Sequence, residues 1–118
     1  MQFSISNKTR KKIPRATFEK IKDGILGKRY ELSLVFCGNS LSRKLNLKFR
    51  GKDKPANILS FPLSKNSGEI FINLSKLGEF SPLHLFIHGL LHLKGMPHGA
   101  RMNRVEKKWL VKSQSASI

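Results

Sequence analysis

The amino-acid sequence predicts an α+β fold, a layered α/β domain, and three observations lead to this prediction. In the first half of the chain, short segments with strand-like alternation of apolar residues take turns with longer segments of helical spacing. Two further strand-like segments are separated by only a short loop, which is typical of an antiparallel hairpin. The last third of the chain has helical periodicity alone. This order predicts a sheet covered by helices, in which the strands before the hairpin can be parallel with right-handed crossovers.

The length of the chain bounds its organisation. It has 118 residues, the size of one domain, and its 39% hydrophobic content is enough for one core. We assign residues 1–112 to a single domain. The polar residues 113–118 are expected to form a disordered tail.

Each element in the first half of the chain has its own sequence signal. Residues 2–6 alternate apolar and polar side chains, as a short strand does. A helix opened by Pro14 and ended by Gly27 follows, with apolar residues at helical spacing. Residues 30–36 form the next predicted strand, and residues 38–40 cap a second helix. The predicted apolar face of this second helix consists of Leu41, Leu45 and Phe49.

The second half of the chain begins with the hairpin. Residues 58–62 are predicted to be a strand ended by Pro62, and residues 68–73 are its antiparallel partner. Ser81 fits the N-cap of the next helix, which is apolar on all sides, and Pro82 fits its first position. The last helix is predicted from about Ala100 to Val111, and its apolar residues are Met102, Val105, Trp109 and Leu110.

Three histidines follow one another at spacings that bring them together. His88 and His92 lie one helical turn apart, so their side chains point the same way. Gly95 is expected to end the helix in a left-handed conformation, so that the chain turns back and His98 reaches the same point. Three converging neutral imidazoles form an open zinc site. Buried structural histidines are an alternative for the first pair alone, but the longer HxxxHxxGxxH pattern favours a metal.

The residue after the first histidine separates this pattern from that of a protease. Zinc proteases with this ligand spacing carry a glutamate there as the general base. This chain has Gly89 instead, which offers no side chain to activate water. A metalloprotease is therefore disfavoured.

The charge of the chain is strongly one-sided. Its formal net charge is +16, from 23 Lys and Arg against 7 Asp and Glu. This excess predicts a polyanionic partner bound through phosphate contacts and counterion release, although an enzyme from a cell with a basic proteome is an alternative. The predicted RNA-binding residues are Lys44, Lys48, Arg50, Lys52 and Lys54, at the end of the second helix and in the loop after it.

The single cysteine, the N-terminal residues and the lack of long apolar runs bear on the cellular compartment of the protein. Cys37 is the single cysteine, so it forms no internal disulfide, and its apolar surroundings predict a buried small residue. The N-terminal residues contain no apolar core of a signal peptide, and no run of 18 apolar residues occurs. We therefore expect a cytoplasmic protein that does not interact with membranes.

Several short motifs occur together in a fixed order between about residues 30 and 110. They are Leu45-Asn46, Phe49-Arg50-Gly51-Lys52-Asp53, Asn57-Ile58-Leu59-Ser60-Phe61-Pro62, Gly68-Glu69-Ile70 and the triple-histidine stretch. This ordered set resembles the YbeY family of bacterial single-strand endoribonucleases and rRNA maturation factors. The resemblance implies a mixed four-stranded sheet with helices packed around it and a zincin-like metal helix. It also implies one zinc per chain, held by His88, His92 and His98, with Arg50 facing the metal cleft.

The chain departs from the family's pattern at positions that should affect the rate of RNA cleavage. Met96 and Pro97 stand where the family usually has Tyr-Asp before the third histidine, so a carboxylate beside the metal is missing. Ala56 and Asn57 replace the usual Thr-Asp. We expect zinc binding to survive, and RNA cleavage to be about 10–100-fold slower than with Asp at position 97, the scale typical of a lost partner of a metal ligand.

The resulting hypothesis is a zinc-dependent endoribonuclease that acts on single-stranded rRNA ends, with ribosomal particles as partners and no role for DNA. Arg50 would hold the phosphate by a two-pronged hydrogen bond. The general base is unassigned. His84 is more simply an ordinary helix residue, and Glu106 a surface or supporting group. The alternative is an RNA-binding ribosome-assembly factor in which zinc only holds the fold together.

Overall fold

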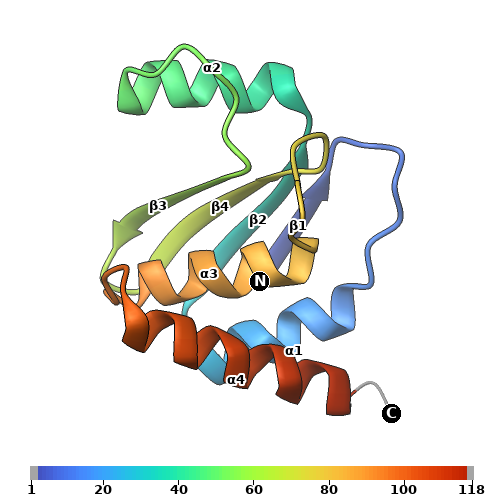
Figure 1. Cartoon of the computed structure of the whole chain (residues 1–118), viewed down its shortest axis with the longest axis vertical. Helices are drawn as coiled ribbons and strands as arrows, with labels where there is room; N and C mark the ends of the chain where they lie inside the picture. Colours follow the sequence, from blue (N-terminus) through green and yellow to red (C-terminus); the bar gives the residue numbers. More distant parts are fainter. Residues whose placement is uncertain (1–2, 117–118) are drawn as a thin grey trace.

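A four-stranded sheet lies between two layers of helices, with α2 on one side and α1, α3 and α4 on the other (Figure 1). This computed structural model describes residues 3–116, and side chains from residue 3 to residue 113. The elements in chain order are β1 (Phe3–Asn7), α1 (Arg15–Leu26), β2 (Glu31–Cys37), α2 (Asn39–Arg50), β3 (Ile58–Ser64), β4 (Ser67–Asn73), α3 (Pro82–Leu93) and α4 (Ala100–Ala116).

The sheet is mixed, with the strand order β1-β2-β4-β3. β1 and β2 are parallel, and so are β2 and β4, whereas β3 runs antiparallel to β4. β3 and β4 form the predicted hairpin, which turns at residues 65–66. The predicted α+β fold class and the mixed four-stranded sheet are therefore confirmed.

The main core lies between the sheet and the helices α1 and α3. Phe18 of α1 packs edge-on against Phe36 of β2 and Phe86 of α3, with ring centroids 5.5 and 5.0 Å apart. These three rings are almost completely buried. The predicted core face of β2 is confirmed, because Leu32, Leu34 and Phe36 all belong to this core. Val35 and Cys37, on the other face of the strand, are buried as well. Burial of such large apolar side chains, each contributing about 1.5–3 kcal/mol, fixes α3 firmly against the sheet.

The buried face of α2 differs from the prediction. Ser42 and Asn46 are the buried residues of this helix, while Phe49 is 58% exposed. The reason is that α2 has to satisfy the backbone of the loop that follows it. The Ser42 hydroxyl accepts from the Ala56 N–H at 2.9 Å, and the Asn46 amide donates to the Lys54 carbonyl at 2.8 Å.

Two element boundaries also differ from the prediction. β3 continues past Pro62 to Ser64, with an irregularity between these residues. Proline is tolerated there because β3 is an edge strand. α4 continues past Val111 into the segment predicted to be a tail, as far as Ala116, while residues 117–118 lie outside the described part. Ser113 is buried, and its hydroxyl donates to the Leu110 carbonyl.

Two expectations about single features can be compared directly with the structure. Cys37 is 1% exposed, as predicted for a buried small residue, and burial raises the pKa of its thiol. Within residues 3–116, none of the helices combines the length and the apolar character needed to cross a membrane.

Candidate metal centre

Helix α3 presents two of the three histidines, and both of its ends follow the sequence signals. The Ser81 hydroxyl accepts a hydrogen bond from the His84 N–H at 3.0 Å, and Pro82 is the first helical residue. After the helix, Gly95 has φ +94°, and its N–H donates to the His92 carbonyl at 2.9 Å. The left-handed residue reverses the chain, so that the segment carrying His98 returns towards the end of α3.

The three imidazoles converge as predicted. The ring centroids of His88, His92 and His98 are 4.2–5.1 Å apart, and one ligand atom from each lies within 4.8 Å of the others. The Nε2 atoms of His88 and His92 are 3.0 Å apart. Two ligands of a tetrahedral zinc at the usual bond length would be separated by about 3.3 Å. The three histidines could therefore bind a metal ion.

The surroundings of His92 favour the neutral form that a metal requires. Burial lowers the pKa of His92, and the neighbouring rings of His88 and His98 lower it further. Glu106 and a hydrogen bond to the Met96 backbone act in the opposite direction. Since the net shift is downward, the imidazole keeps a free lone pair to lower pH, and metal binding competes less with protons.

Glu106 of α4 lies directly behind the cluster. One carboxylate oxygen accepts a hydrogen bond from His88 Nδ1, and the other lies 3.3 Å from His84 Nε2. The glutamate is only 7% exposed. The sequence predicted a surface or supporting group for Glu106. The glutamate is buried, so it is not a surface group, and its position beside a candidate metal ligand was not predicted. The signal was present, because Glu106 follows Met102 by four residues on the apolar face of the last helix.

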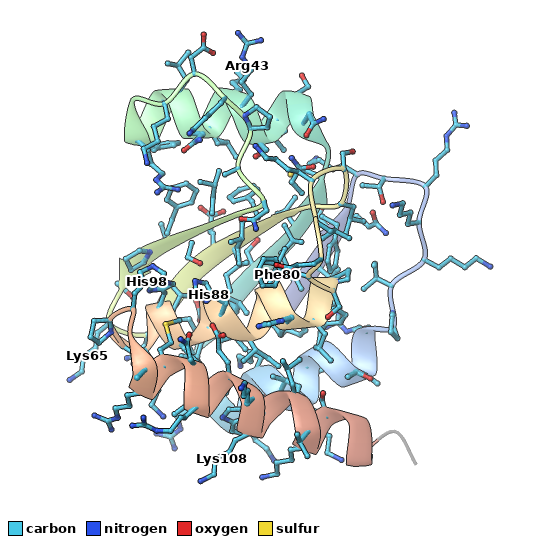
Figure 2. All side chains as sticks on the ribbon, viewed as in Figure 1. Arg43, Lys65, Phe80, His88, His98 and Lys108 are labelled. Atoms are coloured by element: carbon cyan, nitrogen blue, oxygen red, sulfur yellow. The ribbon has the colours of Figure 1, made fainter. Side chains whose placement is uncertain are left out.

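The histidines open into a cleft beside the edge strand β3. Figure 2 shows His98 near the C-terminal end of α3 and His88 nearer the middle of that helix, both on the side that faces the sheet. The cleft has a volume of about 460 Å³, and Arg50 from the end of α2 lines it together with the three histidines. Its other lining residues are Asn57, Ile58, Leu59, Ser60 and Phe61.

A second, basic hollow adjoins this cleft. Its volume is about 580 Å³, and it shares Arg50, Asn57 and Ile58 with the metal cleft. Lys52 and Lys54 line this hollow, and so does Lys76 from the loop after β4, which the sequence prediction did not include. Lys44 and Lys48 are exposed on α2 and line neither hollow. The structure therefore brings together only part of the predicted basic set.

The basic loop between α2 and β3, residues 51–57, is held in place by polar contacts. The Arg43 guanidinium pairs with both carboxylate oxygens of Asp53, at 2.7 and 3.2 Å. This hydrogen-bonded pairing keeps the pKa of Asp53 below its ordinary value. Together with the Ser42 and Asn46 contacts, it fixes the loop that carries Lys52 and Lys54 into the basic hollow.

Gly89 packs closely against the sheet. A Cβ atom on Gly89 would lie 2.9 Å from the Ile58 Cδ1 and Ser60 Oγ atoms, and 3.1 Å from the Ile70 Cδ1 atom. These atoms are the ends of side chains on β3 and β4, so a larger residue at position 89 would require these side chains to shift. The residue that serves as general base in zinc proteases therefore corresponds here to a glycine that packs against the sheet.

Pro97 lies on the other side of His98. It is exposed and lines a separate hollow of about 430 Å³, together with residues 94–101. This hollow shares only His98 with the metal cleft. The position at which the resembling family carries a carboxylate is therefore not among the residues that line the cleft.

Comparison with known proteins identifies relatives of this chain. The sequence model described as "Endoribonuclease YbeY" matches residues 2–116. A curated protein of that name from Ehrlichia ruminantium (strain Gardel) is 43% identical over an alignment of 82 residues, which covers 57% of this chain and 52% of that protein. Another, from Chlorobium phaeovibrioides, is 27% identical over 93% of this chain and 89% of that protein. The chain spans about half the length of the two Ehrlichia ruminantium relatives that it matches.

A structural relative extends the likeness to the whole fold. The solution structure of a protein from Thermotoga maritima superposes with a TM-score of 0.64 and covers 97% of this chain and 90% of its own. The two sequences are 23% identical, so this likeness concerns the fold alone. The family match, by contrast, covers almost the full length of the sequence. On that evidence, the chain belongs to the YbeY family.

Proposed function

We propose that this protein is a zinc-dependent endoribonuclease that cuts single-stranded RNA. The observation that carries this proposal is that three converging imidazoles and Arg50 line one cleft, which continues into a basic hollow. The relatives named as endoribonucleases support the reaction class. A single strand can lay one phosphate at the imidazoles and its neighbours along the lysines.

Zinc suits the donor atoms of the cluster. Neutral imidazole nitrogens at this separation match its usual ligands, and three protein ligands leave a position for water or substrate. When bound, such a metal supplies Lewis acidity, which lowers the pKa of a bound water or polarises a phosphoryl oxygen. We propose one zinc per chain, held by His88, His92 and His98.

The other residues of the cleft act on the substrate. Arg50 forms no ion pair with a described acidic residue, so its guanidinium is available for a phosphate. Its planar fork can hold two oxygens of the scissile phosphate in a fixed orientation, which a lysine cannot do equally well. Lys52, Lys54 and Lys76 then neutralise the adjoining phosphates.

One observation favours a second candidate function. Among the described residues, none that lines the metal cleft carries a carboxylate. The three histidines of the cleft are assigned to the metal, so a general base would have to come from a group outside this lining or from the RNA itself. If cleavage needs such a base, the same structure would serve as an RNA-binding ribosome-assembly factor with a structural zinc.

The substrate follows from the same chemistry. We propose rRNA ends in ribosomal particles as the target, because exposed single-stranded RNA next to a dense phosphate surface suits a chain of net charge +16. This assignment would locate the activity in the cytoplasm. The resemblance of the motif set to an rRNA maturation family supports it, and the structure supplies the basic hollow that the assignment needs.

The proposal is tested with purified protein and a labelled single-stranded RNA. We expect cleavage by the zinc-loaded protein, loss of cleavage after chelation, and recovery when zinc is returned. A single-stranded DNA of the same sequence should stay intact. RNA that is bound but never cut by the folded, zinc-loaded protein would support the assembly factor and contradict the enzyme.

Arg50 provides a second test within the same assay. Replacing it with Ala should lower kcat/KM by about 10–100-fold, the loss expected when a hydrogen bond to a charged group worth about 1.5–3 kcal/mol is removed. Arg50→Lys keeps the charge and should recover only part of the rate. Equal rates for Arg50→Lys and the native chain would show that charge alone is needed.

A further inference from the structure

We propose that Glu106 is a positioning residue of the metal centre, which fixes the His88 ring in the tautomer that presents Nε2 to the metal. This inference rests on the proposed metal site and extends it to a second helix. It assigns a role to the contact chain His84–Glu106–His88, which links α3 to α4.

The geometry leaves little freedom to the carboxylate. Each of its oxygens faces a different imidazole, His88 Nδ1 on one side and His84 Nε2 on the other. Both histidines lie on α3, one turn apart, whereas the glutamate comes from α4. Because Glu106 is 7% exposed, water has little access to compete for these contacts. Glu106 is therefore held by two partners and holds them in turn.

The contact determines where the His88 proton lies. A carboxylate only accepts hydrogen bonds, so the Nδ1 atom that faces it must carry the hydrogen. The Nε2 atom of a neutral His88 then has a free lone pair. That atom points towards His92 Nε2, which lies 3.0 Å away. The bond to Glu106 thus selects the ring orientation and the tautomer that the ligand cluster requires.

Charge adds a second effect. The chain carries only 7 acidic residues, and none of the described ones lines the metal cleft. Glu106 is the acidic residue in contact with a member of the imidazole cluster. A negative charge behind a ligating imidazole increases its basicity and so strengthens metal binding. Glu106 can thereby supply to His88 the kind of support that a carboxylate at position 97 would give to the third ligand.

The packing of α4 keeps Glu106 in register. Met102, one turn earlier on the same face, is 1% exposed in the main core. One turn later, the Trp109 ring lies against Gly24 of α1, where a Cβ atom would approach it to 2.5 Å. Met102 and Trp109, packed on either side of Glu106 along the helix, fix the position of α4 along the axis of α3. The carboxylate therefore reaches His88 without the freedom of a surface side chain.

Zinc affinity is the first measurement. Glu106→Ala should weaken zinc binding by about 10–100-fold in competition with a chelator of known affinity, the loss typical of a missing partner of a metal ligand. Glu106→Gln can still accept from His88 Nδ1 but has lost the charge, so a smaller loss is expected. Glu31→Gln removes the same charge from an exposed site on β2 and should leave the affinity unchanged.

The tautomer of His88 is the second measurement, and it needs no metal. Nitrogen NMR of the metal-free protein should show His88 with its proton on Nδ1 in the native chain and in Glu106→Gln. In Glu106→Ala the ring should shift towards the Nε2-protonated form. A residue that only supported the fold would change the unfolding midpoint without moving this signal.

The outcomes separate the two proposals. If native His88 carries its proton on Nε2, or if Glu106→Ala binds zinc as tightly as the native chain, the positioning role is overturned. If Glu106→Ala does not fold, the native tautomer and the Glu106→Gln affinity decide. If the native chain binds no zinc while His88 is protonated on Nδ1, the proposed zinc-dependent function fails but the positioning contact stands.

Discussion

The two sides of the cleft are built on different principles. The imidazole side is a small set of rings on α3 and the turn after it, fixed by hydrogen bonds, a left-handed glycine and close packing. The basic side, formed by the end of α2, residues 51–57 and the loop after β4, carries the exposed cations Arg50, Lys52, Lys54 and Lys76. Metal binding requires donor atoms placed to within tenths of an ångström, whereas a field that attracts phosphates depends on the number of charges. Single changes should therefore have large effects on the first side and graded effects on the second.

The most severe test of this contrast is His92→Ala. His92 is one of the three proposed ligands, and its ring lies against both other rings. Its replacement leaves two ligands, so we expect the zinc content to fall from one per chain to almost none. Metal analysis of the folded protein measures this directly. Ser40→Ala, at an exposed position of α2, serves as the control and should retain one zinc. Full zinc content in His92→Ala would show that the metal, if any, binds elsewhere.

Gly89→Ala tests how tightly the imidazole side is packed. The added Cβ atom would press on the sheet at 2.9 Å, and overpacking of this kind costs about 1–3 kcal/mol of unfolding free energy. Urea unfolding of the metal-free protein provides the value. Ser40→Ala, at an exposed position of α2, should change the same free energy by less than about 0.5 kcal/mol. Similar stabilities for both variants would mean that α3 can move away from the sheet at little cost.

The basic side should respond in proportion to charge. Replacing Lys52, Lys54 and Lys76 with Gln is expected to reduce the slope of log affinity for single-stranded RNA against log salt by about 2, since each phosphate contact contributes about 0.7. Binding should be strongly salt-dependent and largely indifferent to sequence. The slope is obtained from titrations of a labelled single-stranded RNA with the protein at several salt concentrations.

A matched triple variant on α4 provides the control. Arg104, Lys107 and Lys108 are exposed on that helix, and the side chain of Lys108 points away from the sheet (Figure 2). Their replacement with Gln removes the same charge and should leave most of the slope intact. If both triples reduce the slope equally, the RNA senses the overall charge and not the basic side of the cleft.

Pro97→Asp is expected to have the smallest effect. The sequence alone predicted a gain of about 10–100-fold in cleavage, on the scale of a restored partner of a metal ligand. Since Pro97 does not line the metal cleft and Glu106 already contacts His88, we now expect a gain of about tenfold or less. The gain is measured by comparing the RNA-cleavage rates of zinc-loaded Pro97→Asp, Pro97→Ala and the native chain. An equal gain in the alanine variant would assign the effect to the backbone, and no gain would show that proton handling lies elsewhere.

The sequence by itself determined the features that depend on neighbours in the chain. Helix spacing places His88 and His92 on one face, the Ser81 cap begins α3, and Gly95 reverses the chain after it, because each of these effects acts within a few residues. The hairpin and the core face of β2 follow from equally local patterns. These signals were sufficient for the fold class and for the convergence of the imidazoles.

Only the tertiary structure decided what depends on packing between distant segments. The contact of Glu106 with His88 joins two residues that are 18 positions apart in sequence and lie on different helices. The apolar face of α4 indicated that Glu106 is turned inward, but not which side chain it contacts. The polar face of α2 was missed because Ser42 and Asn46 are buried by a loop that periodicity cannot place. Arg50, at the end of α2, and Lys76, in the loop after β4, line the same hollow only because the sheet order brings these segments together. Local preference selects the elements, and the need to bury apolar surface while satisfying every buried polar group selects their arrangement.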